Sequence, residues 1–474
     1  MGKEKTLKLN YKRTFTIGFA FFGILLLWQV YDSWCPTFLT ELFGKAIYGS
    51  EAGLHAKQVQ YLVGIMMAID NLAALILLPI FGRLSDKTHT KIGKRMPYIL
   101  VGTLVTAIAF PFVPVFFHYN NLLGTIVIMA VVVIFMMMYR NPAVALMPDM
   151  TPKPLRSKAN GIINIMGYIG GAFATVVGIF FVLSKYLGTK TTSTWQYQNI
   201  WAIELPFLIA SVLMVISALV LFLTIKENKI AEEVKEDMEL GEKQAEVADR
   251  IVEDTPMTKA NRAMLLFILI AEFFWFMADN GIATFMGNYT VYYLGAETSS
   301  NMVNTIVGGL GSVIGFAIGG LIAERLGRKW TVVSGLGLTL LSYLVWGVLT
   351  FTVLKGAAGG QVFPWQIYVI WFVKGFGMSL VHVNSFPMVV ELCSSKEIGR
   401  FTGYYYASSM AAQTITPIAL GSLMLIEGFS WEYLPVYATA CVIISVVVFL
   451  FMKNVKINKV QVSKGLEAFD GGDD

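Results

Sequence analysis

The sequence predicts an all-α membrane protein in which twelve transmembrane helices form two pseudo-symmetric six-helix bundles. Apolar residues make up 56% of the 474 residues and charged residues only 14%, against about 25% charged in soluble proteins. Twelve apolar runs reach the roughly 20 residues that cross a bilayer. A short loop with a glycine, an acid and then a glycine with two bases occurs twice, half the chain apart, at 82–95 and 320–329. Such a repeat indicates an internal duplication, as found in many transporters.

The runs divide the chain into three parts. The first run follows five basic residues and has no small-residue cleavage site, so we expect a retained helix rather than a signal peptide. The expected spans are 14–43, 58–82, 96–117, 122–148, 158–183, 199–225, 263–294, 299–324, 330–352, 364–391, 398–426 and 430–452. We therefore expect an N-terminal bundle over 1–225, a cytoplasmic charged linker over 226–262, and a C-terminal bundle with a cytoplasmic tail over 263–474.

The linker carries eleven acidic and seven basic residues. Its Ile230, Val234 and Met238 recur every four residues, which predicts a helix on a surface. With the N-terminus in the cytoplasm, cytoplasmic segments hold 29 of the 36 Lys and Arg residues, and the opposite side holds Lys45, Lys57, Lys185, Lys190 and Lys355. This asymmetry predicts a multi-pass protein of the cell membrane with both termini in the cytoplasm.

Composition also excludes several classes of protein. The net charge of +5 follows from positive cytoplasmic loops and does not indicate a nucleic-acid partner. Cys35, Cys393 and Cys441 have no metal-like spacing, and we interpret them as buried apolar residues. No serine–lysine, paired-aspartate or histidine–glutamate motif stands at helical spacing, so we expect no enzyme activity, metal or cofactor. The expected partners are a lipid bilayer and a small molecule, and the expected state is a monomer.

The two repeated loops are candidate gating elements at the cytoplasmic mouth. An acid there can meet a helix N-terminus or a basic side chain, and a moving bundle can make and break that contact. Because acid and bases recur in both halves, we interpret the loops as a state-dependent latch as well as positively charged topology signals. With their neighbours they give a gating set of Gly82, Asp86, Arg95, Asp149, Arg156, Glu324, Arg328, Glu391 and Arg400.

These stretches resemble the major facilitator superfamily, and within it the glycoside–pentoside–hexuronide cation symporters and sucrose–proton symporters. The first loop reads Gly82-x3-Asp86-x-Thr88-x4-Gly93-Lys94-Arg95-x-Pro97. A second stretch contains Pro142, Pro148-Asp149-Met150, Arg156 and Ala159-Asn160-Gly161, and Glu391 with Arg400-Phe401-Thr402-Gly403 echoes it. The resemblance implies two six-helix bundles, a central cavity, alternating access and coupled uptake of a glycoside.

The family's known coupling sites are missing at the matching positions. Melibiose-type sodium symporters carry two acids in the second helix, where this chain has Ala74 and Leu78. Plant sucrose symporters carry an acid in the fourth helix, where this chain has Val133. Coupling must therefore come from other residues or be absent, and we expect a proton rather than sodium.

Ionisable residues inside apolar helices cost about 2.5–3.5 kcal/mol each on insertion scales and are functional candidates by default. The candidates for proton coupling are Asp32, Asp70, Arg140, Glu272, Lys374 and His382. We expect Arg140 to pair with an acid of the first half and Lys374 with one of the second. For Asp70, a purely structural pair is an equal alternative, and for His382 a packing role is favoured over a proton relay.

Sugar recognition needs polar partners for hydroxyl groups and flat rings for the C–H face. The first and seventh helices, equivalent in the repeat, both combine these. The predicted substrate-binding residues are Trp28, Tyr31, Asp32, Trp34, Asn164, Trp275, Asp279, Asn280 and Asn384. The sequence thus predicts a secondary transporter that takes up a glycoside or small oligosaccharide by proton symport. A carrier of lipid or another amphiphile, and a non-transporting sugar sensor, stay open as alternatives.

Overall fold

The computed structural model describes residues 7–51, 53–180, 200–251, 258–296, 298–354, 363–393 and 397–452. Lys185, Lys190 and Lys355, which entered the charge count, lie outside these residues, as does the predicted tail after 452. The first half contains α1 (Tyr11–Tyr48), α2 (Gln60–Lys87), α3 (Met96–Ala109), α4 (Phe112–His118), α5 (Leu122–Asp149), α6 (Arg156–Phe180) and α8 (Ile200–Thr224). The long helix α9 (Glu227–Ile251) follows.

The second half repeats this arrangement. It contains α10 (Lys259–Asn288), α11 (Thr298–Leu326), α12 (Arg328–Leu349), α13 (Trp365–Leu392), α14 (Ile398–Leu423) and α15 (Leu434–Leu450). One π-helical turn extends α10 to Tyr293 and another extends α12 to Leu354. The described segments follow the expected spans closely, and the predicted all-α membrane fold is confirmed.

Two local features differ from the simplest expectation. The run expected as one helix over 96–117 breaks into α3 and α4 at Phe110, because Pro111 and Pro114 interrupt the regular hydrogen bonding. Eleven helices among the described residues are long and apolar enough to cross a membrane. The expected eleventh span, α14, has the length but is less apolar, since it carries Tyr404, Tyr405, Tyr406, Gln413 and several hydroxyl side chains.

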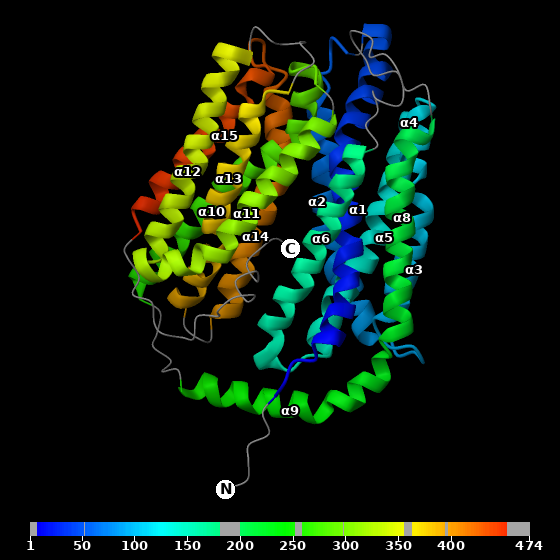
Figure 1. Ribbon diagram of the computed structural model, residues 1–474, viewed down its shortest axis with the longest axis vertical. Helices are drawn as coiled ribbons and strands as arrows, with labels where there is room; N and C mark the ends of the chain where they lie inside the picture. The colour runs from blue at the N-terminus through cyan, green and yellow to red at the C-terminus, as the bar shows by residue number, and fades with distance from the viewer. Residues whose placement is uncertain are drawn as a thin grey trace.

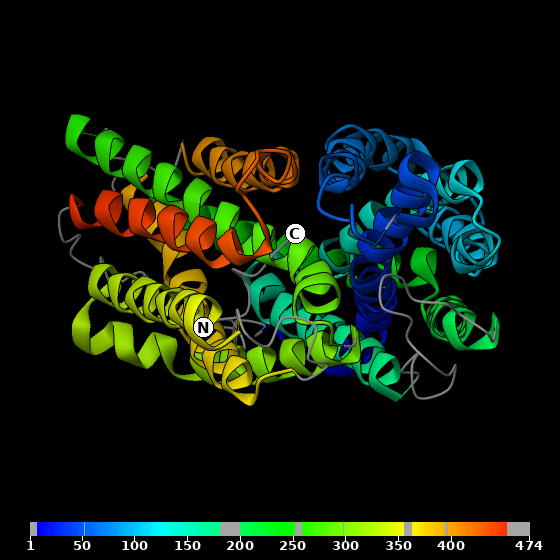
Figure 2. The ribbon, with the colours of Figure 1, turned by 90° about the horizontal axis from the view of Figure 1, so that it is seen from above.

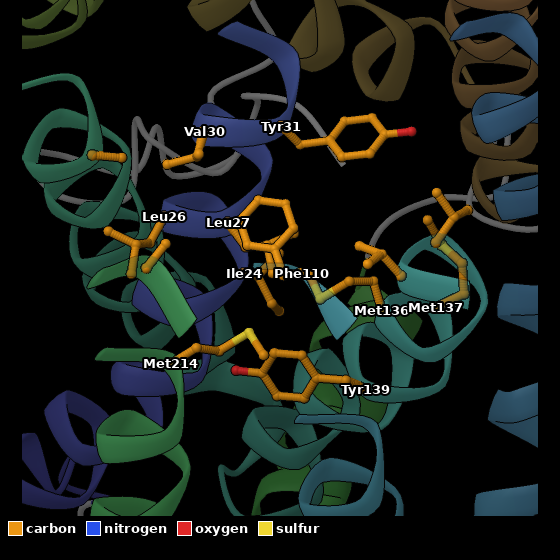
Figure 3. Packing of buried hydrophobic residues seen from close by; sticks show 14 of the residues in the cluster. Ile24, Leu26, Leu27, Val30, Tyr31, Phe110, Met136, Met137, Tyr139 and Met214 are labelled. Carbon is orange, nitrogen blue, oxygen red and sulfur yellow. The ribbon is translucent and has the colours of Figure 1, made fainter. Parts of the chain in front are cut away.

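The helices gather into two groups on either side of the molecule, with α9 running across one end of both (Figure 1). The view from above shows the same two groups (Figure 2). The main apolar core of the first group spans α1 to α8 and takes only Met302 from the second half, whose helices form two cores of their own. In the first core, Met214, Met136 and Phe110 surround α1, and the Tyr139 hydroxyl donates to the carbonyl of Ala20 at 2.6 Å (Figure 3). We call these groups the N-terminal and C-terminal bundles; the exact domain boundaries stay predictions.

The bundles meet at the end opposite α9, which we call the far end. The helices α2 and α14 approach closely there, because Gly64 faces the carbonyl of Pro417 and Gly421 faces the backbone at Gln60. A methyl group at either glycine would overlap backbone atoms of the partner helix, so small residues allow this contact. Toward α9 the ribbons of the two bundles diverge (Figure 1).

Candidate functional site

The centre of α1 presents one open carboxylate. Between Thr16 and Lys45, Asp32 is the only exposed residue of a helix whose other positions are buried or half-buried. The helix α1 packs against α2, α5, α6, α8 and α10, so it lies inside the molecule rather than at its rim. An exposed acid at this depth indicates that Asp32 faces an open space between helices.

The ring pair beside Asp32 links α1 to α2. The hydroxyl of Tyr31 donates a 2.7 Å hydrogen bond to Oδ2 of Asp70, and Trp28 contacts Tyr31 edge to face, with ring centroids 5.4 Å apart. Asp32 and Asp70 are close enough to interact electrostatically. The structure thus gathers four of the predicted residues: two carboxylates, a phenol and an indole whose Nε1 has no protein partner in the described part of the chain.

The C-terminal bundle carries a charge pair at a similar depth. Nζ of Lys374 on α13 pairs with Asp279 on α10, and Asp279 is one of the second-half acids expected as its partner. The buried Tyr343 of α12 interacts electrostatically with both. Next to Asp279, Oδ1 of Asn280 is buried without a hydrogen-bond partner among the described residues. Polar atoms without protein partners are suited to a polar ligand.

Other predicted residues lie elsewhere. Trp34 packs on Phe38 inside the N-terminal core, and Trp275 is fully buried in the core of the C-terminal bundle. Asn384 lies ten residues from Lys374, about 15 Å along α13; its amide donates to Leu380 O at 2.9 Å. These three side chains support packing rather than the exposed part of the site.

The remaining candidates have different surroundings. Asn164 is half-buried on α6. Arg140, expected to pair with an acid, forms no ion pair with the described residues, and the bonded partner of Asp70 is Tyr31. The ring of His382 packs edge-on against Phe276 at 5.5 Å.

A neutral polar network joins the bundles at the far end. The Asn288 amide donates to Oγ1 of Thr40 and Oε1 of Gln60, both at 3.0 Å, and Oγ1 of Thr37 donates to Asn288 Oδ1 at 3.1 Å. All four side chains are at most 4% exposed. We call Thr37, Thr40, Gln60 and Asn288 the far-end network. Sequence reasoning missed it because it ranked ionisable residues and passed over neutral amides, although Gln60 and Asn288 lie at helix positions where such a search would find them.

A second far-end contact involves an acid. The hydroxyl of Tyr292 donates to Oε1 of the buried Glu41 at 2.8 Å, again between α10 and α1. Asn71 of α2 donates to the carbonyl of Gln413 of α14 at 3.2 Å, nearer the middle. Together these bonds hold the two bundles in contact on the side away from α9.

At the end with α9, charged groups bind within a bundle instead. Arg95 is 5% exposed; it meets Asp86 at 2.5 Å, Asp149 at 2.9 Å and the hydroxyl of Ser85 at 2.6 Å. Lys94 also reaches Asp149, at 3.0 Å. Burial alone would lower the pKa of Arg95, but the Asp149 and Asp86 carboxylates raise it overall. The loop at 82–95 therefore locks α2, α3 and α5 to one another.

The second loop reproduces part of this arrangement. Nε of Arg328 meets Oε1 of Glu391 at 2.8 Å, which matches Arg95 with Asp149. Glu324, the predicted counterpart of Asp86, is exposed and forms no ion pair with the described residues. The repeat thus preserves the pair between the third and fourth membrane spans of each bundle, and neither pair crosses between bundles in this conformation.

Three members of the gating set have local roles. Gly82 lies against the side chain of Asn141. Arg156 donates to the carbonyls of Pro148 and Thr151 at 3.0 and 3.1 Å and closes its own turn. Arg400 lies over the ring of Tyr404.

The linker helix contributes an acid that sequence reasoning did not single out. The carboxylate of Glu227, 5% exposed, accepts hydrogen bonds from the backbone N–H groups of Lys94, Arg95 and Met96 at 3.0–3.2 Å. It therefore caps the N-terminus of α3 from another helix. Gly93, at φ +118°, makes room, since a Cβ there would overlap Glu227. Among eleven linker acids, nothing in the sequence marks this one.

No group of three or more His, Cys, Asp or Glu residues in the described ranges is placed to hold a metal ion. The open arrangement of Asp32, Tyr31, Trp28 and Asp70 can bind polar groups and a flat apolar face.

Comparison with known proteins agrees with this architecture. A family model described as the Major Facilitator Superfamily matches residues 15–352 and 268–468. The fold is similar to a crystal structure of the POT family transporter PepTSo, at 15% identity and TM-score 0.63, with 94% of this chain and 98% of that chain covered. It is also similar to a bacterial homologue of the iron transporter ferroportin in an inward-facing state, at 15% identity and TM-score 0.61, with 93% and 99% covered. No curated protein matches the sequence.

At this low sequence identity the similar structures establish the fold and do not identify the substrate of this chain. The family model covers nearly the whole chain and agrees with the two helix bundles and the paired loops. The chain therefore belongs to the major facilitator superfamily and is a membrane-spanning secondary transporter rather than an enzyme.

Proposed function

We propose that the protein takes up a glycoside or small oligosaccharide of about disaccharide size, driven by protons, in the cell membrane with both termini in the cytoplasm. This places it with the glycoside and sucrose symporters that its loops resemble. The observation that carries the proposal is the exposed Asp32 at the centre of α1, beside the Trp28–Tyr31 ring pair and the Tyr31–Asp70 hydrogen bond.

The chemistry of this cluster suits a sugar. A carboxylate accepts hydrogen bonds from two hydroxyl groups of one ring, and hydrogen bonds to charged groups are worth about 1.5–3 kcal/mol. An indole edge-packed on a phenol is held rigidly and offers a face for the sugar C–H groups. Asn280 and the Asp279–Lys374 pair supply further polar atoms from the opposite bundle.

The direction of access follows from the same arrangement. The far-end network and the α2–α14 contact hold the side away from α9 closed. Under the predicted orientation α9 is cytoplasmic, so this conformation is the one that opens inward. Alternating access then requires the far-end network to break while the ion pairs inside each bundle persist.

The test begins with binding, because the residues do not name the sugar. A thermal-shift screen of the purified protein against common mono- and disaccharides selects the ligand that stabilises it. Uptake of that sugar, in labelled form, is then measured in proteoliposomes with an inward proton gradient. We expect accumulation that collapses with a protonophore and does not depend on sodium.

Asp32→Asn should abolish accumulation, whereas Glu239→Gln, an exposed acid on α9, should leave it unchanged. Unchanged uptake by Asp32→Asn would remove Asp32 from the site. Stabilisation by lysolipids and by no sugar would replace the proposal with an amphiphile carrier. Tight sugar binding without any flux would replace it with a sensor.

A further inference from the structure

A buried tyrosine lies beside the ion pair of the C-terminal bundle, and its hydroxyl is not bonded. Tyr343 of α12 is 0% exposed, and its hydroxyl has no hydrogen-bond partner in the described residues. It lies close enough to Lys374 and Asp279 to interact electrostatically with both. Buried hydroxyl groups in native proteins usually have a partner, because leaving one unbonded is unfavourable. An unbonded hydroxyl beside a charged pair indicates that its partner is bonded elsewhere in this conformation.

The packing of α12 on α13 fixes the position of this hydroxyl. Gly335 of α12 and Gly377 of α13 lie against each other, and a Cβ on either would overlap the carbonyl oxygen of the other. As consecutive membrane spans the two helices run antiparallel, so Tyr343 and Lys374 lie on the same side of this contact, about 12 Å and 4.5 Å from it. Helical side chains lean toward the N-terminus of their own helix. The phenol of Tyr343 therefore leans toward the level of Lys374.

The two members of the ion pair differ in how accessible they are. The side chain of Asp279 is 32% exposed and that of Lys374 only 16%. A ligand therefore reaches the carboxylate more readily than the ammonium. A carboxylate only accepts hydrogen bonds and suits sugar hydroxyl groups, whereas a lysine ammonium only donates them. When a sugar bonds to Asp279, the deeper Lys374 needs an acceptor on its protein side.

Two other polar groups of this bundle do not supply that acceptor. The indole of the buried Trp346, one turn further along α12, also has an unbonded Nε1, but an indole N–H is a donor only. Glu272, a predicted coupling residue on α10, is 0% exposed, and neither of its carboxyl oxygens has a hydrogen-bond partner in the described ranges. The residues one turn away from it belong to the apolar core of the bundle. The Tyr343 hydroxyl is therefore the group suited to accept from Lys374.

We propose that Tyr343 is a positioning residue of the sugar site: its hydroxyl accepts a hydrogen bond from the Lys374 ammonium when sugar hydroxyl groups bond to the Asp279 carboxylate. One N–H···O bond, from Lys374 to Asp279, is exchanged for another, from Lys374 to Tyr343. No covalent bond changes and no proton is transferred. The ammonium thus keeps an acceptor while the carboxylate turns to the sugar. This proposal rests on the sugar substrate proposed above.

The first test needs no sugar. Thermal stability of the purified full-length protein is measured for Tyr343→Phe, Asp279→Ala and the double variant, as a double-mutant cycle. Tyr343→Phe alone should leave the melting temperature unchanged or raise it, because it removes an unbonded hydroxyl. In the Asp279→Ala background the same change should lower the melting temperature, because Lys374 then bonds to Tyr343. Additive effects in the double variant, or a lower melting temperature of Tyr343→Phe alone, would overturn the proposal.

Two matched variants control this cycle. Tyr293→Phe removes another phenol hydroxyl that is unbonded in the described part of the chain, about 21 Å along α10 from Asp279, and its effect should be the same in both backgrounds. In a Lys374→Ala background, Tyr343→Phe should cause no further loss, because the ammonium it serves is absent. A further loss there would assign the hydroxyl to another partner and overturn the proposal.

The second test measures sugar binding. Sucrose, maltose, lactose and melibiose are titrated into the purified protein by isothermal titration calorimetry. A sugar that binds the natural protein should bind Tyr343→Phe about 10- to 150-fold more weakly, the value of one hydrogen bond to a charged group, and should bind Tyr293→Phe equally well. Equal affinity in Tyr343→Phe would overturn the proposal. If neither these sugars nor those of the thermal-shift screen bind the natural protein, the proposed substrate fails, while the stability cycle still decides whether Tyr343 serves Lys374.

Discussion

The contact between Glu227 and the N-terminus of α3 gives a prediction that can be worked in free energy. In Glu227→Ala, the backbone N–H groups of Lys94, Arg95 and Met96 lose their acceptor while they lie at a largely buried position. Loss of an N-cap costs about 0.5–2 kcal/mol, and loss of a negative charge at a helix N-terminus costs about 0.3–1 kcal/mol. We expect a local destabilisation of about 1–3 kcal/mol in all.

Amide hydrogen exchange reports this cost at the residues concerned. Local opening follows its own free energy, and each 1.4 kcal/mol corresponds to a factor of about ten. The N–H groups of 94–96 should therefore exchange about 5- to 140-fold faster in Glu227→Ala. Glu227→Gln should give a smaller increase, because the amide keeps one acceptor oxygen but loses the charge.

The matched control is Glu239→Gln, which removes an exposed acid from the same helix and should leave exchange at 94–96 unchanged. Limited proteolysis provides a second measure, because Asn228 also ties α9 to the loop by donating to the carbonyls of Thr90 and Lys91. If Glu227→Ala and Glu239→Gln give the same exchange rates as the natural protein, the cap contributes nothing and α9 is held by its apolar contacts alone.

Other substitutions test the far-end network, the α10–α13 ion pair and the thiol after α13. Asn288→Leu removes hydrogen bonds worth about 0.5–1.5 kcal/mol each. A cysteine introduced at position 37 should therefore react faster with an impermeant maleimide. An unchanged rate would show that the far-end network does not hold this side closed. Lys374→Ala leaves Asp279 unpaired at a cost of about 3–5 kcal/mol, and thermal stability should recover when both become alanine, not fall further. Burial and nearby Glu397 raise the pKa of Cys393 to about 11. Maleimide labelling of Cys393 should therefore be slow at neutral pH, become faster as the pH approaches that value, and be faster in Glu397→Gln. A labelling rate that does not respond to this substitution would exclude Glu397 as a cause of the raised pKa.

Patterns that repeat over many residues were predictable from the sequence. Helix spans follow from runs of about 20 apolar residues, and one or two polar residues within a run do not change the predicted span. That Lys374 would pair with an acid of the second half followed from scarcity, because a lysine inside a span needs an acid and few are available. The break at Pro111 was signalled by its residue type, but the length of the apolar run concealed it.

Contacts that depend on one residue among many similar ones were not predictable. Glu227 differs from the other linker acids only in its place beside Gly93, which requires the three-dimensional packing of α9 on the loop. Glu324 repeats the sequence position of Asp86 but forms no ion pair with the described residues, although Arg328 pairs with Glu391 as Arg95 does with Asp149. A sequence repeat indicates equivalent positions, and which acid an arginine selects depends on distances that a repeat does not specify.

The contrast between the two ends of the molecule suggests how the energy of switching is kept small. The far-end network uses amides and hydroxyls, and each such bond is worth only about 0.5–1.5 kcal/mol once water replaces it on opening. Had ion pairs such as Arg95–Asp149 crossed between the bundles, separation would leave buried charges unpaired at about 3–5 kcal/mol each. Because these pairs lie within a bundle, the bundles can part as rigid units. The hydrogen bonds of the far-end network that break on opening are therefore weak and reversible.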